Sequence, residues 1–294
     1  MRITNQMMVN NVIQYIDDIK NKINTTQEQI ASTKKFQTPS DDPTTSSMCL
    51  QLKSSLSISE GYQNTANIIS DWMSTTDFSL EQLSEIATKA YNIVLRGLND
   101  TVDADERKSS LATELNEMIK KAVDIGNSSF QGNYIFAGVR VDQPAFIMSD
   151  ENTITYNGIS KEMVRSIGQN SKVTMNIDGN ETIKPLIQAL IEARNYLANN
   201  DTSNLPGSLD NLKTALEMLT ASRTENGTRM RQIENSISNM EKSDIAIRSI
   251  LSKKEDTSIA EAYSLLASQE STYQAVLEIG SRTLSALNLF DYLN

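Results

Sequence analysis

The chain has 294 residues, a net charge of -10 and a mean hydropathy of -0.38, with one cysteine and no histidine. The acidic balance argues against a nucleic-acid partner, because affinity for phosphates comes from Lys and Arg side chains. The missing histidine excludes the usual zinc ligand sets and the Ser-His and Cys-His nucleophile pairs, so we expect no enzyme, no metal and no cofactor.

No stretch of the sequence is apolar enough to predict a membrane span. The longest apolar runs, such as residues 93–95 and 265–267, fall far short of the ~20 residues that a spanning helix needs. Residues 1–8 lack the continuous apolar run of a secretory signal peptide, so we expect no cleavable signal. We therefore expect no membrane partner, and a secreted chain would need another export route.

The first predicted helix carries a narrow apolar stripe and ends at a proline-bracketed turn. Its apolar residues recur at three- and four-residue intervals, which is the pattern of a heptad seam. These residues are Val9, Val12, Ile16, Ile19, Ile23 and Ile30. Polar residues such as Asp17 and Lys20 lie between them, so the helix needs a partner to cover its stripe. Residues 39–43 stop the helix, and Asp41 and Asp42 there are typical of helix caps rather than of an acid-base pair.

One long helix is predicted for residues 44–96, which contain no proline and a single glycine, Gly61. Its heptad seam predicts helices packed side by side in a bundle. The seam residues are Tyr62, Ala66, Ile69, Met73, Thr76, Leu80, Leu83, Ala87, Ala90 and Val94. Residues 97–103 turn the chain. A following helix carries Leu111, Leu115, Met118, Ala122 and Ile125 at the same spacing.

The composition changes at Gly126, where β-forming residues begin to alternate with turn residues up to about residue 180. The pairs Asn157-Gly158 and Asp178-Gly179 are typical of hairpin turns. A helix is predicted for residues 185–198. Residues 206–208, Pro-Gly-Ser, predict a break before another helix over residues 209–222.

The last third is helical again, with a charged break at residues 253–257. The helix before the break has an apolar seam with one polar intruder, Asp244. The C-terminal helix after it carries apolar residues that we expect to form an assembly surface with the N-terminal stripe. These residues are Tyr263, Leu266, Tyr273, Leu277, Leu284 and Leu287.

Helices at both ends therefore flank a β-rich middle. We predict a mainly α fold, an elongated long-helix bundle formed by the N- and C-terminal segments with a small β-rich inserted domain. The expected divisions are a terminal coiled-coil assembly domain (1–42 plus 258–294), a helical rod core (43–138 plus 206–257) and an inserted outer domain (139–205).

Both ends of the chain resemble the flagellin superfamily. The first helix and its Asp-Asp turn are similar to the family's N-terminal segment, although Thr33 and Phe36 depart from its commoner residues. Residues 227–234, with Arg229 and Glu234, resemble the Gly-x-Arg-x-x-x-Ile/Leu-Glu stretch that opens a long core helix in that family. The acidic break before the last helix is also similar.

Three segments are similar, within this superfamily, to the proteins that join the flagellar hook to the filament. The first is the turn Pro39, Ser40, Asp41, Asp42 and Pro43. The second contains Gly132, Tyr134, Phe136 and Gly138, and the third is residues 289–293. Filament flagellins usually lack the proline-bracketed turn and end differently.

The resemblance implies a structural subunit of the bacterial flagellum, secreted unfolded by the flagellar type III route and assembled at the tip through its terminal helices. The partners that it implies are further copies of the chain in a ring, hook-associated protein 1, flagellin and a cytoplasmic export chaperone. Its site residues would be contact residues.

Other functions remain open at this stage. A flagellin that forms the filament itself shares most of these features, and a secreted non-flagellar coiled-coil adhesin shares the helices but not the paired terminal motifs. An enzyme or ligand-binding domain in residues 139–205 is a third alternative, but that segment has no phosphate loop, metal-ligand spacing or nucleophile-base pair. Heptad seams alone are more typical of ordinary bundle cores, and only the resemblance favours assembly.

Overall fold

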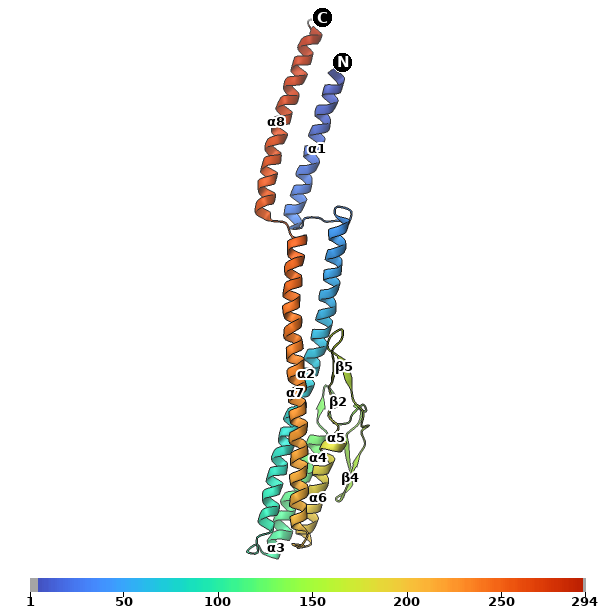
Figure 1. Cartoon of the computed structure of the whole chain (residues 1–294), viewed down its shortest axis with the longest axis vertical. Helices are drawn as coiled ribbons and strands as arrows, with labels where there is room; N and C mark the ends of the chain where they lie inside the picture. Colours follow the sequence, from blue (N-terminus) through green and yellow to red (C-terminus); the bar gives the residue numbers. More distant parts are fainter. Residues whose placement is uncertain (1–4, 293–294) are drawn as a thin grey trace. The chain divides into compact units, whose positions relative to one another are not determined.

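The computed structural model describes the backbone of residues 5–292 and the side chains of residues 7–282 (Figure 1). The helices are α1 (Asn5–Ser32), α2 (Pro43–Gly97), α3 (Ala104–Glu106), the π-helical turn η1 (Arg107–Leu111), α4 (Ala112–Gly126), α5 (Gly179–Thr182), α6 (Lys184–Ala198), α7 (Leu205–Glu255) and α8 (Ile259–Tyr292). The strands are β1 (Ser129–Phe130), β2 (Asn133–Tyr134), β3 (Phe146–Asp150), β4 (Thr153–Tyr156), β5 (Val164–Ser166) and β6 (Lys172–Thr174). The predicted mainly α class with a small β insert is confirmed. No helix within the described residues is long and apolar enough to cross a membrane.

The chain divides into two compact units. Residues Met1–Ile58 and Ser243–Asn294 form the first, called the terminal unit below, and residues Ser59–Lys242 form the second, called the central unit. The long helices α2 and α7 each contribute to both. The three-part division expected from the sequence stays a prediction.

In the terminal unit, α1 and α8 lie side by side and run antiparallel, with both chain ends at the same end of the pair (Figure 1). The other members of this unit are the first part of α2 and the last part of α7. The breaks between the helices fall at residues 33–42 and 256–258, where the sequence predicted a proline-bracketed turn and a charged break.

The heptad seam predicted for α2 is confirmed in the central unit. Nine of its ten residues are buried, and only Tyr62, at the edge of the unit, is partly exposed. Thr76 is buried within the seam because its Oγ1 donates a hydrogen bond to the Trp72 carbonyl at 2.9 Å. The seam of α2 thus runs through the core of the central unit.

The helix α6 completes this core by packing against α4. Apolar residues on most sides of α6 are buried, among them Leu186, Leu190 and Leu197. Such a helix is stable only inside a core. Pro185 lies in its first turn, where a missing N–H removes no hydrogen bond.

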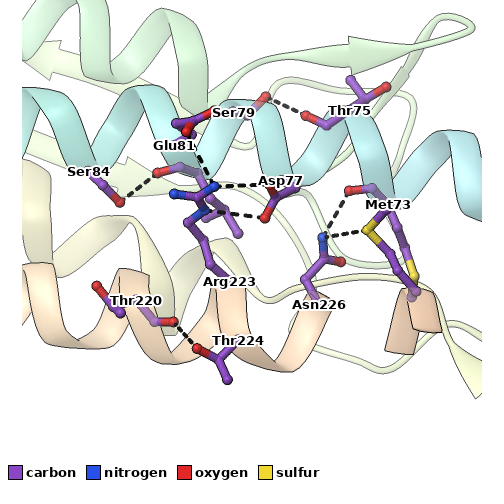
Figure 2. A network of polar contacts seen from close by, with 12 residues as sticks. Met73, Thr75, Asp77, Ser79, Glu81, Ser84, Thr220, Arg223, Thr224 and Asn226 are labelled. Atoms are coloured by element: carbon purple, nitrogen blue, oxygen red, sulfur yellow. Dashed lines mark hydrogen bonds and ion pairs between the residues drawn. The ribbon is translucent and has the colours of Figure 1, made fainter. Parts of the chain in front are cut away.

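Polar contacts join α7 to α2 across the seam (Figure 2). The Asn226 side chain is fully buried and donates to the Met73 carbonyl at 2.9 Å. One turn away, Arg223 donates to both carboxylate oxygens of Asp77, at 3.1 and 3.3 Å, and lies 3.5 Å from Glu81. A two-pronged guanidinium contact of this kind fixes direction as well as distance, so it helps to align the two helices.

The β-rich segment consists of three antiparallel hairpins, β1-β2, β3-β4 and β5-β6. The predictions of hairpin turns at Asn157-Gly158 and Asp178-Gly179 were wrong. Asn157 follows the last strand of its hairpin, and Asp178 caps α5 by accepting a hydrogen bond from the Asn180 N–H at 2.9 Å. Asx-Gly pairs suit several turns and caps, so the pair alone does not select a hairpin.

The helix α7 is continuous where the sequence predicted a break at residues 206–208 and separate helices beyond it. Pro206 lies in its first turn, where proline is tolerated. Gly227 lies inside the helix, and its neighbours Asn226 and Met230 pack on the core. Tertiary packing therefore overrides the local breakers.

We predict that Leu115→Ala lowers the free energy of unfolding of the central unit by about 2–5 kcal/mol, the usual range for emptying a buried leucine site. Leu115 on α4 is 0% exposed. Trp72 is the sole tryptophan of the chain and is 4% exposed in the same core, so its fluorescence during urea unfolding reports this unit. The matched control Leu95→Ala removes a side chain that is 50% exposed, and a cost similar to that of Leu115→Ala would contradict the observed core.

Candidate assembly interface

The predicted N-terminal stripe faces α8. Val9, Val12, Ile16, Ile19, Ile23 and Ile30 are all half-buried, and Thr26, between the last two, is buried. A seam that is only half covered is what two helices alone can achieve, since each has a single neighbour.

On α8 the seam consists mainly of residues other than those chosen from the sequence. Ala262 and Gly280 are buried, and Gln269 and Val276 are half-buried. With Leu266 and Tyr273 between them, these residues recur at three- and four-residue intervals. A Cβ atom on Gly280 would lie 2.9 Å from Cγ1 of Val12, so the two helices approach closely there. Sequence reasoning missed the small residues because a seam is normally marked by large apolar side chains. Their regular spacing was the available signal.

The C-terminal residues chosen from the sequence are divided between the seam and its flanks. Leu266 and Tyr273 are half-buried, whereas Tyr263 and Leu277 are 57% and 43% exposed. Leu284 and Leu287 lie in α8, but outside the part of the chain whose side chains are described. That these residues form an assembly surface stays a prediction.

An apolar groove of about 300 Å³ lies between α1 and α8 near the ends of the chain. Its lining residues are Val9, Val12, Ile13, Ile16, Leu277, Gly280 and Ser281. Further large apolar residues are exposed on the same two helices, including Tyr15 of α1 and Ile279 of α8, which are 63% and 59% exposed. The pair is therefore apolar on its flanks as well as along its seam.

The terminal unit has almost no core of its own. Among its described side chains, the buried hydrophobic residues are Cys49, Leu56 and Ala262. Fourteen large hydrophobic residues of the same unit are exposed. Exposed apolar surface of this extent is typical of sites that contact other proteins.

The proline-bracketed turn orders the start of α2. Asp42 caps that helix by accepting from the Thr45 N–H at 3.0 Å, as expected for a capping residue. Asp41 instead closes the preceding loop by accepting from the N–H groups of Gln37 and Thr38, at 3.1 and 2.9 Å. These bonds stabilise the charged forms: those from Thr38 lower the pKa of Asp41, and those from Thr45 lower the pKa of Asp42. Pro39, Ser40 and Pro43 complete the turn and the first position of α2.

The remaining motif residues lie in the central unit. Gly132 occupies the β1-β2 turn with φ of 82°, and Gly138 has φ of 64°, which are conformations that favour glycine. Phe136 is fully buried, and Tyr134 is half-buried and packs on the same core.

The two motif residues of α7 differ in role. Arg229 donates to the Asn176 carbonyl at 3.0 Å and forms an ion pair with Glu225, so it ties α7 to the segment before α5. Glu234 is exposed. Within the described residues, no cluster of Cys, Asp and Glu side chains is suited to hold a metal ion.

Comparison with known proteins matches the chain to flagellar proteins. The model of the bacterial flagellin N-terminal helical region matches residues 3–140. Flagellar hook-associated protein 3 of Salmonella typhimurium is 27% identical over 168 residues, which are 57% of this chain and 52% of the relative. The chain thus spans about half the length of the curated relatives it matches.

Two solved structures share the fold. A flagellar hook-associated protein from Vibrio parahaemolyticus superposes with a TM-score of 0.68 at 19% identity, covering 74% of this chain and 100% of that one. Bacillus cereus FlgL superposes with a TM-score of 0.62 at 21% identity, covering 69% of this chain and 99% of that one. The matched N-terminal region and the curated relative thus make the chain similar to the flagellin superfamily, and the two solved structures show that it shares their fold.

Proposed function

We propose that this chain is a structural subunit of the bacterial flagellum that joins the hook to the filament. The observation that carries the proposal is the uncovered apolar surface of the terminal unit, whose two paired helices expose residues on both flanks of their seam. A surface of this kind suits a subunit whose neighbours in an assembly supply the missing half of its core. The likeness to hook-associated protein 3 supports the junction position over the filament.

The mechanism that we propose begins with an unfolded chain in the flagellar type III export route. Helices with a narrow seam gain most of their stability from packing, so α1 and α8 would order fully only when neighbouring subunits cover them. The central unit, which has its own core, would fold without that help. Premature polymerisation in the cytoplasm would thereby be avoided.

The partners that follow from this role are further copies in a ring, hook-associated protein 1 on the hook side and flagellin on the filament side. A cytoplasmic export chaperone would shield the apolar flank of α8, where Tyr263 and Leu277 are exposed. Chaperone binding that persists after deletion of residues 255–294 would show that its site lies elsewhere.

Electron microscopy of flagella from a deletion strain tests the junction role. We expect hooks without filaments, with flagellin released into the medium, because the surface that receives the first filament subunits would be missing. Hooks that carry the junction proteins but no filament polymer would instead identify the chain as flagellin, which is the alternative.

Assembly should depend on the stripe of α1 and not on its charges. We predict that Ile16→Asp/Ile19→Asp leaves the central unit folded but abolishes filament growth, because burying an unpaired carboxylate costs at least several kcal/mol. Asp17→Ala and Lys20→Ala, at exposed positions of the same helix, should swim normally, since such changes cost about 0.5 kcal/mol or less. A motile Ile16→Asp/Ile19→Asp strain would show that this stripe is not an assembly surface.

Gly280 offers a second test through the close approach of α1 and α8. We predict that Gly280→Val raises the helix propensity of α8 but separates the helices, because its side chain would meet Val12, and that filaments become rare. Ala275→Val adds the same type of side chain at an exposed position of α8 and should assemble normally. Equal filament numbers for the two variants, counted by electron microscopy, would mean that close packing at Gly280 is not needed.

A further inference from the structure

The two breaks of the terminal unit are tied to each other through the backbone. One break leads from α1 to α2, and the other leads from α7 to α8. Lys34 and Asp256 form an antiparallel bridge. The Lys35 N–H donates to the Glu255 carbonyl at 2.8 Å, and the Thr257 N–H donates to the Thr33 carbonyl at 2.9 Å. Two segments more than 200 positions apart in the sequence are therefore joined at the points where their helices end.

Charged side chains strengthen this tie. The Glu255 side chain is only 12% exposed; its Oε1 accepts from Lys53 Nζ of α2 at 2.9 Å and lies 3.5 Å from Lys34 Nζ. Lys34 also forms an ion pair with Asp256 at 2.6 Å. We call Lys34, Lys53, Glu255 and Asp256 the clasp. The hydrogen bond that Lys34 donates to Asp256 lowers the pKa of Asp256 and raises the pKa of Lys34. Both groups are therefore charged at neutral pH.

We propose that the clasp joins the two breaks into one joint, about which α1 and α8 turn together as a pair. The seam between α1 and α8 holds these two helices together as a pair. A chain break without contacts is a free pivot, so with two free pivots the pair could change its angle to α2 and to α7 over a wide range. Here Glu255 at the end of α7 contacts Lys34, in the segment after α1, and Lys53 of α2. A change of backbone angle at one break therefore requires a change at the other. The joint is a property of the single chain, so it does not depend on the flagellar role.

The joint can be opened in two steps. Glu255→Gln/Asp256→Asn keeps side-chain size but removes both negative charges of the clasp. Adding Thr257→Pro removes the N–H that donates to Thr33, at a position just before α8 where proline is compatible with a helix start. Glu241→Gln/Glu261→Gln is the matched control, because it also removes two negative charges, from exposed positions of α7 and α8 outside the clasp.

Distances between pairs of spin labels on the purified full-length chain measure how far the helices move relative to each other at the two breaks. Cys49, which is buried, is first replaced by alanine so that labels attach only where intended. Labels at residues 20 and 54 report α1 against α2, labels at residues 249 and 268 report α7 against α8, and labels at residues 20 and 268 report the α1-α8 pair. Circular dichroism confirms that each variant keeps its helix content.

We expect both joint distances to have narrower distributions in the parent chain and in the control than in the triple variant. In the triple variant both should broaden together while the α1-α8 distance stays as in the parent, and the double variant should show a smaller broadening. The proposal is overturned if only one joint distance broadens, which would mean independent pivots, or if neither does. It is also overturned if the α1-α8 distance broadens as well, since the clasp would then hold the pair together rather than act as its joint.

Discussion

Two helices that lie side by side can bury only one face of each, and the terminal unit is built within this limit. The apolar residues of α1 and α8 cover more of each helix than a single partner can hide, so their flanks remain exposed. Hydrophobic burial is the main favourable term in folding, and this unit lacks most of it. Its stability therefore depends on what covers those flanks, which is the physical basis for proposing that it takes part in assembly.

The central unit avoids this limit, because several other elements surround α2 and bury more than one of its faces. It also gives hydrogen-bond partners to buried arginine side chains. Arg194, on the buried helix α6, donates to the Glu151 carbonyl and to the side chains of Asn116 and Asn152. Arg107 donates to the carbonyls of Gly97 and Asn99 at the end of α2, where a helix leaves such groups without internal partners. A buried guanidinium with several acceptors is compatible with a core that holds its own shape.

Periodicity predicted the long helices and the α2 seam because a heptad repeat sustained over many turns has few alternative interpretations. Local turn chemistry was less informative. Pro206 and Asp178-Gly179 are each compatible with several local structures, and the residues packed around them determine which one forms. Gly280 was missed because a glycine on a helix normally signals weakness, whereas its role in permitting a close approach depends on Val12 from the other end of the chain. The clasp could not be predicted either, since Lys34, Lys53 and Glu255 become neighbours only when the two breaks meet.

The clasp also bears on how α1 and α8 find their register. Apolar seams that repeat every seven residues can slip by one heptad, about 10 Å, and still bury similar residues. Val12 lies 22 residues before Lys34, and Gly280 lies 24 residues after Asp256, so the helices have nearly equal lengths from the clasp to their close approach. A slip of one heptad would move Gly280 away from Val12 or pull the bridge apart. The charged contacts at one end of the pair and the missing side chain near the other therefore select the same alignment, and they do so within a single chain before any neighbour covers the flanks.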